Sequence, residues 1–135
     1  MRDCIPYFLG NEMSQIYEQE LMHHYRHSAY KGMLESASFA SDAHNPSCGD
    51  SVSFQVIVKD NAIEKILFQG SGCVISQAAA SLLAEHVVKS TLVDIAKLTT
   101  LDMLALVKIS LGPNRSRCAL LALEALQQGV QLYNS

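Results

Sequence analysis

Two hydrophobic periods divide this chain into a strand-forming part and a helix-forming part. Over residues 51–59 every second side chain is apolar, and this period of two predicts a strand with one buried face. The polar pair 60–61 indicates a turn, after which 62–70 is predicted to return as the antiparallel neighbour. A weaker alternation over 36–43 predicts a further strand.

The period changes after the glycine-rich stretch that follows these strands. Residues 73–89 are rich in alanine and leucine and predict a helix, and 92–107 predicts one or two short helices. A first helix is predicted over 14–27. A last helix is predicted over 116–130, after a loop over 111–115, and a glycine near its end is expected to stop it. The sequence therefore predicts an α+β fold, in which a small three-stranded antiparallel sheet carries helices packed on one face.

Length and composition favour one folded domain. The 135 residues fit a single domain, which we place at 14–135, after an irregular extension over 1–13. Apolar residues make up 49% of the chain, enough to form a core, and the ten Lys and Arg residues are scattered, which argues against nucleic-acid binding. No apolar run approaches the roughly 18 residues of a membrane span, and the N-terminus lacks an apolar signal sequence. We therefore expect a cytoplasmic protein without a membrane partner.

Four cysteines in a chain expected in a reducing cytosol favour metal binding or chemistry over disulfides. Cys48 lies in a predicted turn, and Asp50, two residues on, could supply a carboxylate to the same centre. Cys73 opens its predicted helix, and Cys118 falls in the first turn of the last predicted helix, after its N-cap Ser116. Because a helix N-terminus favours negative charge, both helix-start thiols are predicted to have lowered pKa values.

Three motifs surround these cysteines and follow one another in the chain. They are Asn45-Pro46-Ser47-Cys48-Gly49-Asp50, Gly70-Ser71-Gly72-Cys73-Val74-Ile75-Ser76 and Arg117-Cys118-Ala119-Leu120-Leu121-Ala122-Leu123-Glu124-Ala125-Leu126. In this order they resemble the IscU/SufU/NifU N-terminal family of iron–sulfur cluster assembly scaffolds. The resemblance covers roughly residues 20–130.

The resemblance implies both a site and a function. Cys48, Cys73 and Cys118 match the cluster ligands of the family, and Asp50 matches an aspartate that can bind metal and that tunes how readily the cluster is released. The implied cofactor is a transient [2Fe-2S] cluster or a Zn²⁺ ion. A cysteine desulfurase would deliver persulfide sulfur, with Cys118 as the implied acceptor, and apo iron–sulfur proteins would receive the cluster. The chain would act as a scaffold rather than as an enzyme, as a monomer or weak dimer.

Two departures from the family keep other functions open. Arg117 stands where IscU proteins carry a histidine, as in SufU-type members, yet the 45 residues from Cys73 to Cys118 leave little room for the SufU insertion. A zinc-bound, SufU-like sulfur acceptor, which would be a sulfurtransferase, is the first alternative. A structural zinc domain that serves only as an interaction module is the second. Arg117 itself can be a solvated cation or a group that stabilises the Cys118 thiolate.

The remaining candidate residues have weaker support. Cys4 has no counterpart in the family pattern and is expected to be a free thiol. His23 and His27 are spaced i, i+4 on the first predicted helix and could bind a metal, although an exposed polar face is the simpler interpretation. The adjacent His24 should point about 100° away from His23, so these two should not bind one ion together. His44 lies four residues before Cys48 and could approach the metal.

Overall fold

A three-stranded sheet forms one layer of the structure. The computed structural model describes residues 19–45, 49–107 and 113–134. The strands are β1 (Phe39–Asn45), β2 (Asp50–Lys59) and β3 (Ala62–Ser71). They lie in the order β1-β2-β3, and each pairs with its neighbour in antiparallel fashion. Asp60 and Asn61 both have positive φ, the conformation of a tight hairpin turn between β2 and β3.

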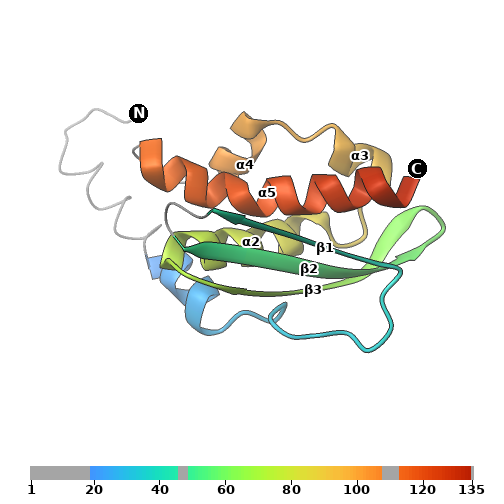
Figure 1. The fold of residues 1–135 in the computed structure, drawn as a ribbon, viewed down its shortest axis with the longest axis horizontal. Coiled ribbons are helices and arrows are strands. Elements are labelled where there is room, and N and C mark those ends of the chain that lie inside the picture. Colours follow the sequence, from blue (N-terminus) through green and yellow to red (C-terminus); the bar gives the residue numbers. More distant parts are fainter. Residues whose placement is uncertain (1–18, 46–48, 108–112, 135) are drawn as a thin grey trace.

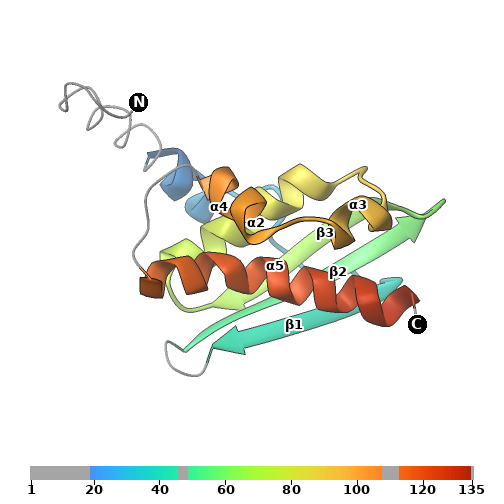
Figure 2. The same ribbon diagram turned by 90° about the horizontal axis from the view of Figure 1, so that it is seen from above.

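Helices form the second layer, on one face of the sheet (Figure 1). After a first helix over 19–26, they are α2 (Val74–Val87), α3 (Leu92–Ala96), α4 (Thr100–Val107) and α5 (Pro113–Asn134). Figure 2 shows α5 lying over β1 and β2, with α2 beside it over β3. The two short helices, α3 and α4, pack on α5 and form an outer layer. The predicted α+β fold, with its helices on one sheet face, is confirmed.

The core lies between the sheet and the two long helices. Val52, Phe54 and Val56 are fully buried on the helix-facing side of β2, as the period of two predicts. Their neighbours on β3 include Phe68, whose ring lies 6.3 Å from that of Phe54. Nearly every residue of α2 from Ile75 onward is buried, because the sheet, α5 and α4 cover this alanine-rich helix from several sides.

Most predicted elements correspond to observed ones. The predicted strands over 51–59 and 62–70 match β2 and β3. The strand predicted over 36–43 is observed as β1, which begins three residues later and ends two residues later. The segment 92–107 forms two helices, and Thr99 caps the second by accepting a hydrogen bond from the Asp102 amide. The first helix is observed over 19–26, while the first part of its predicted range, 14–18, lies outside the described residues.

The last helix was predicted with the wrong ends. It begins at Pro113, inside the predicted loop, so Ser116 is a helical residue and not its N-cap. Proline favours the first helical position, because its fixed φ suits a helix and its missing N–H has no partner there. The helix also continues through Gly129 to Asn134. A Cβ at Gly129 would lie 2.6 Å from Ser41 Oγ and 2.7 Å from the Phe39 ring, so this glycine serves the close approach of α5 to β1.

The segment before β1 crosses the sheet. Lys31 forms a parallel bridge with Phe68, and the amide of Gly32 donates to the Phe68 carbonyl, so this segment pairs with the free edge of β3. The Leu34 amide then donates to the Gln55 side chain on the face of β2 that carries no helix. None of the described helices has the length and apolar character that a membrane crossing requires.

Candidate metal centre

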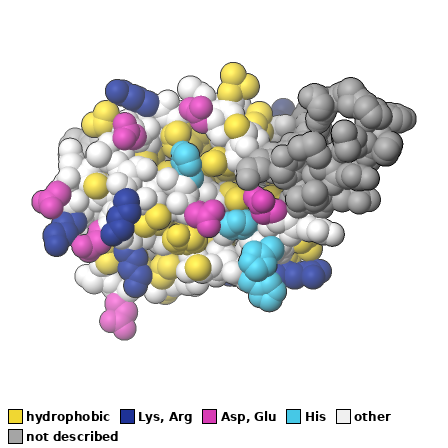
Figure 3. Space-filling view, turned by 180° about the vertical axis from the view of Figure 1, so that it is seen from behind, with side chains coloured by type: hydrophobic (Ala, Val, Ile, Leu, Met, Phe, Trp, Pro, Cys, Tyr) yellow, Lys and Arg dark blue, Asp and Glu magenta, His cyan; other side chains and the backbone are white. Residues whose placement is uncertain are grey.

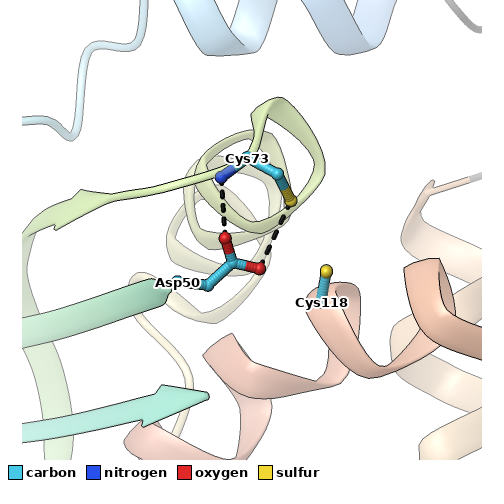
Figure 4. A group of neighbouring side chains, drawn as sticks. All are labelled: Asp50, Cys73 and Cys118. Carbon is cyan, nitrogen blue, oxygen red and sulfur yellow. Dashed lines mark hydrogen bonds between the residues drawn. The ribbon is translucent and has the colours of Figure 1, made fainter. Parts of the chain in front are cut away.

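The start of β2, the end of β3 and the start of α2 lie close together at one end of the sheet. Ser51 of β2 lies opposite Ser71 of β3, so the start of β2 and the end of β3 are neighbours. Asp50 therefore lies beside the residues that connect β3 to α2, and Cys73 is the N-cap of α2. Figure 4 shows the side chains of Asp50, Cys73 and Cys118 pointing toward one another from β2, the start of α2 and α5.

Asp50 and Cys73 are joined by two hydrogen bonds. The backbone amide of Cys73 donates to Asp50 Oδ1 at 2.7 Å, and the Cys73 thiol donates to Asp50 Oδ2 at 3.4 Å. The Cys73 sulfur also accepts from the Ser76 amide at 3.4 Å, in the manner of a helix-capping group. A single carboxylate thus fixes both the backbone and the side chain of Cys73.

Gly72 makes this approach possible. Its φ is +113°, a conformation that residues with a side chain rarely adopt. A Cβ at this position would also collide with Asp50, at 2.7 Å from its Cα and closer still to Oδ1. The glycine just before Cys73 is therefore required by the position of the neighbouring carboxylate.

Cys118 approaches the pair from α5. Its side chain is buried, and the potential ligand atoms of Asp50, Cys73 and Cys118 all lie within 4.8 Å of one another. Because α5 begins at Pro113, Cys118 lies beyond the first helical turn, contrary to the sequence prediction. Burial, with hydrogen bonds to Asp50 and Cys73, raises the pKa of the Cys118 thiol well above its usual value, so the predicted lowering of its pKa is wrong.

Asp50 is 1% exposed, and its charge is compensated by hydrogen bonds. Burial alone would raise the pKa of this carboxyl. Hydrogen bonds from the Cys118 thiol, the Cys73 amide and the Cys73 thiol outweigh burial and leave the pKa of Asp50 below its usual value. The site therefore holds a buried carboxylate with three donors directed at it.

Gln77 joins the two strand ends that carry the site. Its side chain is 4% exposed, and Nε2 donates to the carbonyls of Ser71 at 3.1 Å and Ser51 at 3.3 Å. Its Oε1 is buried without a hydrogen-bond partner. Sequence reasoning missed this residue, although a lone glutamine in a run of buried alanines is a signal that could have found it.

The other candidate residues lie either outside the described residues or elsewhere on the described surface. Cys48 and Cys4 lie outside the described residues, although Cys48 directly precedes Gly49 and Asp50 in the chain. His44 lies on β1 opposite Ser51, with its side chain exposed on the sheet face away from the helices, so the suggestion that it approaches the metal is wrong. Arg117 is exposed.

The donor set suits a soft or borderline metal. Two thiols and one carboxylate are ligand types that bind zinc and iron–sulfur clusters, once the thiols lose their protons. Ligand atoms on one zinc ion lie about 3.5 Å apart. The ligand atoms of Asp50, Cys73 and Cys118 lie within 4.8 Å of one another, so only small side-chain movements would bring them to that distance. The carboxylate is harder than a thiolate, which makes it the weakest of the three as a ligand for such a centre.

Comparisons with known proteins assign the chain to a family. Residues 16–135 match the model of the NifU-like N-terminal domain. The zinc-dependent sulfurtransferase SufU of Bacillus subtilis is 28% identical, with 87% of this chain and 91% of that protein covered. The iron–sulfur cluster assembly scaffold protein IscU 1 of Archaeoglobus fulgidus is 30% identical, with 87% of this chain and 76% of that protein covered.

Solved structures agree with this result at the level of the fold. A crystal structure from Fervidobacterium islandicum, described as a scaffold protein of iron–sulfur cluster assembly for the SUF system, superposes with a TM-score of 0.72. It is 23% identical, with 86% of this chain and 97% of that chain covered. The chain therefore belongs to the NifU-like N-terminal domain family, as its three cysteine motifs predicted.

Proposed function

We propose that this chain is a scaffold on which an iron–sulfur cluster is assembled and from which it is released. The cluster would be a transient [2Fe-2S] cluster bound by Cys73, Cys118 and Cys48, with Asp50 as a further metal ligand. The observation that carries this proposal is the convergence of Asp50, Cys73 and Cys118 within 4.8 Å, from segments far apart in the chain. Membership of a family that includes scaffold proteins supports it.

The mixed donor set suits a protein that must give up its cluster. Four thiolates would hold iron strongly, whereas a carboxylate in one position weakens the binding. Asp50 also has partners within the chain, because the Cys73 amide and both thiols donate to it. These donors would satisfy the hydrogen-bonding needs of the buried carboxylate after the cluster is released.

Sulfur would be supplied by a cysteine desulfurase. A thiolate of the scaffold attacks the outer sulfur of the desulfurase persulfide, a new S–S bond forms, and the desulfurase cysteine leaves as a thiolate. Conversion of this sulfur to cluster sulfide requires two electrons from a low-potential electron donor such as a ferredoxin or a dithiol. Cys118 is the proposed acceptor of this sulfur. Because Cys118 is buried, the site must open before sulfur can reach it. Cys73 is half-buried, so its rate of sulfur uptake is the one to compare with that of Cys118.

A zinc-dependent sulfur acceptor is the second candidate. It is favoured by the similarity to the Bacillus sulfurtransferase and by the basic residue at Arg117. In this case Zn²⁺ would be held by Asp50 and the cysteines, and the product would be a persulfide passed to another protein. A purely structural zinc domain, the third alternative, would be inert toward a desulfurase.

The test combines the chain with a cysteine desulfurase, cysteine, iron and a reductant under anaerobic conditions, and then adds an apo [2Fe-2S] acceptor protein. The scaffold proposal predicts cluster absorption on the chain, followed by its transfer to the acceptor. The result that would overturn it is a chain that keeps zinc, forms no cluster and accelerates desulfurase turnover. Cys4→Ser is the matched control, because Cys4 lies outside the family pattern.

We infer further that residues 14–135 act as one domain, as a monomer or weak dimer in the cytoplasm. The family match over 16–135 supports the domain boundaries. Size-exclusion chromatography with light scattering checks the oligomeric state.

A further inference from the structure

Three histidines gather at the end of the first helix, away from the Asp50 site; His23 and His24 lie in its last turn and His27 directly follows it. His23, His24 and His27 line a pocket of about 170 Å³ together with Ser81 and Glu85 of α2. Figure 3 shows histidine side chains clustered on this face of the molecule, with acidic side chains beside them. Ser81 follows Cys73 by eight residues on α2, which places the two about 12 Å apart along the helix axis. The histidine cluster is therefore separate from the proposed cluster site.

His23 and His27 have the geometry of a shared metal site. They are one helical turn apart, both are exposed, and their ring centroids lie 5.3 Å apart with planes inclined by 41°. Two imidazoles that bind one ion at roughly 2.1 Å each bring their ring centroids to about 5 Å. The two rings therefore need little rearrangement to bind one ion. Residues spaced i, i+4 can each direct one ring nitrogen to the same side of the helix.

His24 has a different role in the cluster. Its Nδ1 lies 2.9 Å from Ser81 Oγ, which in turn lies 2.6 Å from Ser28 Oγ, so the ring is fixed against α2. Its other nitrogen, Nε2, lies 3.9 Å from the carboxylate of Glu85. The ring of His24 is also farther from His23, at 6.4 Å and nearly perpendicular. His24 therefore anchors the first helix to α2, and Glu85, which lines the same pocket as His23 and His27, adds a carboxylate that favours a cation there.

We propose that His23 and His27 form a second metal site, which binds a divalent transition metal ion of the zinc, nickel or copper class. Neutral imidazole is a good ligand for these ions, whereas iron–sulfur clusters prefer thiolates. The site is open to solvent, so water completes the coordination of the ion and exchange is expected to be fast. The ion would join the last turn of the first helix to the residue that follows it and so stabilise the helix end. This proposal does not depend on the function of the Asp50 site.

The test titrates Zn²⁺ into the metal-free full chain and follows the histidine ring nitrogens by NMR, together with binding stoichiometry by calorimetry. We expect an equivalent of zinc beyond that bound by the thiolate site, with shifts confined to His23 and His27. His23→Ala and His27→Ala should each weaken this second binding event at least tenfold and leave the first unchanged. Both residues are exposed, so neither variant should unfold the chain.

His86→Ala is the matched control, because His86 is an exposed histidine on α2 outside the pocket. It should leave both binding events unchanged. The proposal is overturned if no second equivalent binds, or if the second equivalent persists in His23→Ala and His27→Ala. A failure of the scaffold proposal would instead appear at the thiolate site and leave the histidine shifts in place.

Discussion

The backbone amide of Cys73 donates a 2.7 Å hydrogen bond to Oδ1 of Asp50, and the Cys73 thiol donates to Oδ2 of the same carboxylate. One residue at the start of β2 thereby sets the position of a residue at the start of α2. The chain's own hydrogen bonds hold the helix start and the strand start together. This contact makes Asp50 both a candidate ligand and the group that orients Cys73.

Replacing Asp50 should change how long a cluster stays on the chain. In Asp50→Cys, a fourth thiolate replaces the carboxylate, so cluster transfer to an apo acceptor should slow at least tenfold. In Asp50→Ala, Cys73 loses both hydrogen bonds, and the yield of assembled cluster should fall. Absorption spectra and transfer half-times measure the two effects. Equal transfer half-times for the wild type and Asp50→Cys would contradict the assigned role of the carboxylate.

Gly72→Ala should damage the site more than Gly49→Ala. Both glycines have positive φ, so each substitution costs about 1–2 kcal/mol of backbone strain. Only at Gly72 does the added Cβ also collide with Asp50, whereas at Gly49 it meets no atom within 4 Å. Denaturant unfolding and zinc affinity should therefore both show a larger loss for Gly72→Ala. Similar losses in the two variants would mean that strain alone decides the effect.

Gln77→Glu should weaken metal binding without removing a ligand. The replacement keeps the shape of the side chain but removes the amide donor to the Ser51 and Ser71 carbonyls, and stability should fall by about 1–3 kcal/mol. Zinc affinity should fall as well, because the strand ends that carry Asp50 and Cys73 lose their link. Gln69→Glu, at an exposed position on β3, is the control and should change neither quantity. An unchanged zinc affinity in Gln77→Glu would contradict this positioning role.

Gly129→Ala should destabilise the fold, although alanine normally favours a helix by about 1 kcal/mol over glycine. The added Cβ would lie 2.6 Å from Ser41 Oγ and 2.7 Å from the Phe39 ring, which forces α5 away from β1. We expect a net loss of about 1–3 kcal/mol in the free energy of unfolding. Gln128→Ala, on the exposed side of the same helix, should be neutral or stabilising. A more stable Gly129→Ala variant would show that β1 can yield at this contact.

The sheet could be predicted because each strand has one buried face. Val52, Phe54 and Val56 alternate with polar residues, and the turn residues Asp60 and Asn61 set the hairpin. The ends of α5 could not be predicted in the same way. The sequence around Pro113 has the composition of a loop, and Gly129 is explained only by its contact with β1, which is tertiary information.

The sequence predicted that Asp50, Cys73 and Cys118 come together, but it did not predict the electrostatics of this group. The cysteine motifs identified Cys73, Cys118 and Asp50, and the structure brings these three together. The predicted lowering of the Cys118 pKa failed because it assumed a helix start near Ser116. With α5 beginning at Pro113, burial and the neighbouring Asp50 dominate instead. Gln77 was missed because its role depends on the register of β2 and β3.

The most direct test of the central claim is the content of iron and acid-labile sulfide after anaerobic reconstitution. The scaffold account predicts equal amounts of iron and sulfide on the wild-type chain, lost in Cys48→Ser, Cys73→Ser and Cys118→Ser and retained in Cys4→Ser. A wild-type chain that holds zinc tightly and takes up neither iron nor sulfide would contradict the account. Full iron and sulfide in both Cys73→Ser and Cys118→Ser would contradict the assigned site.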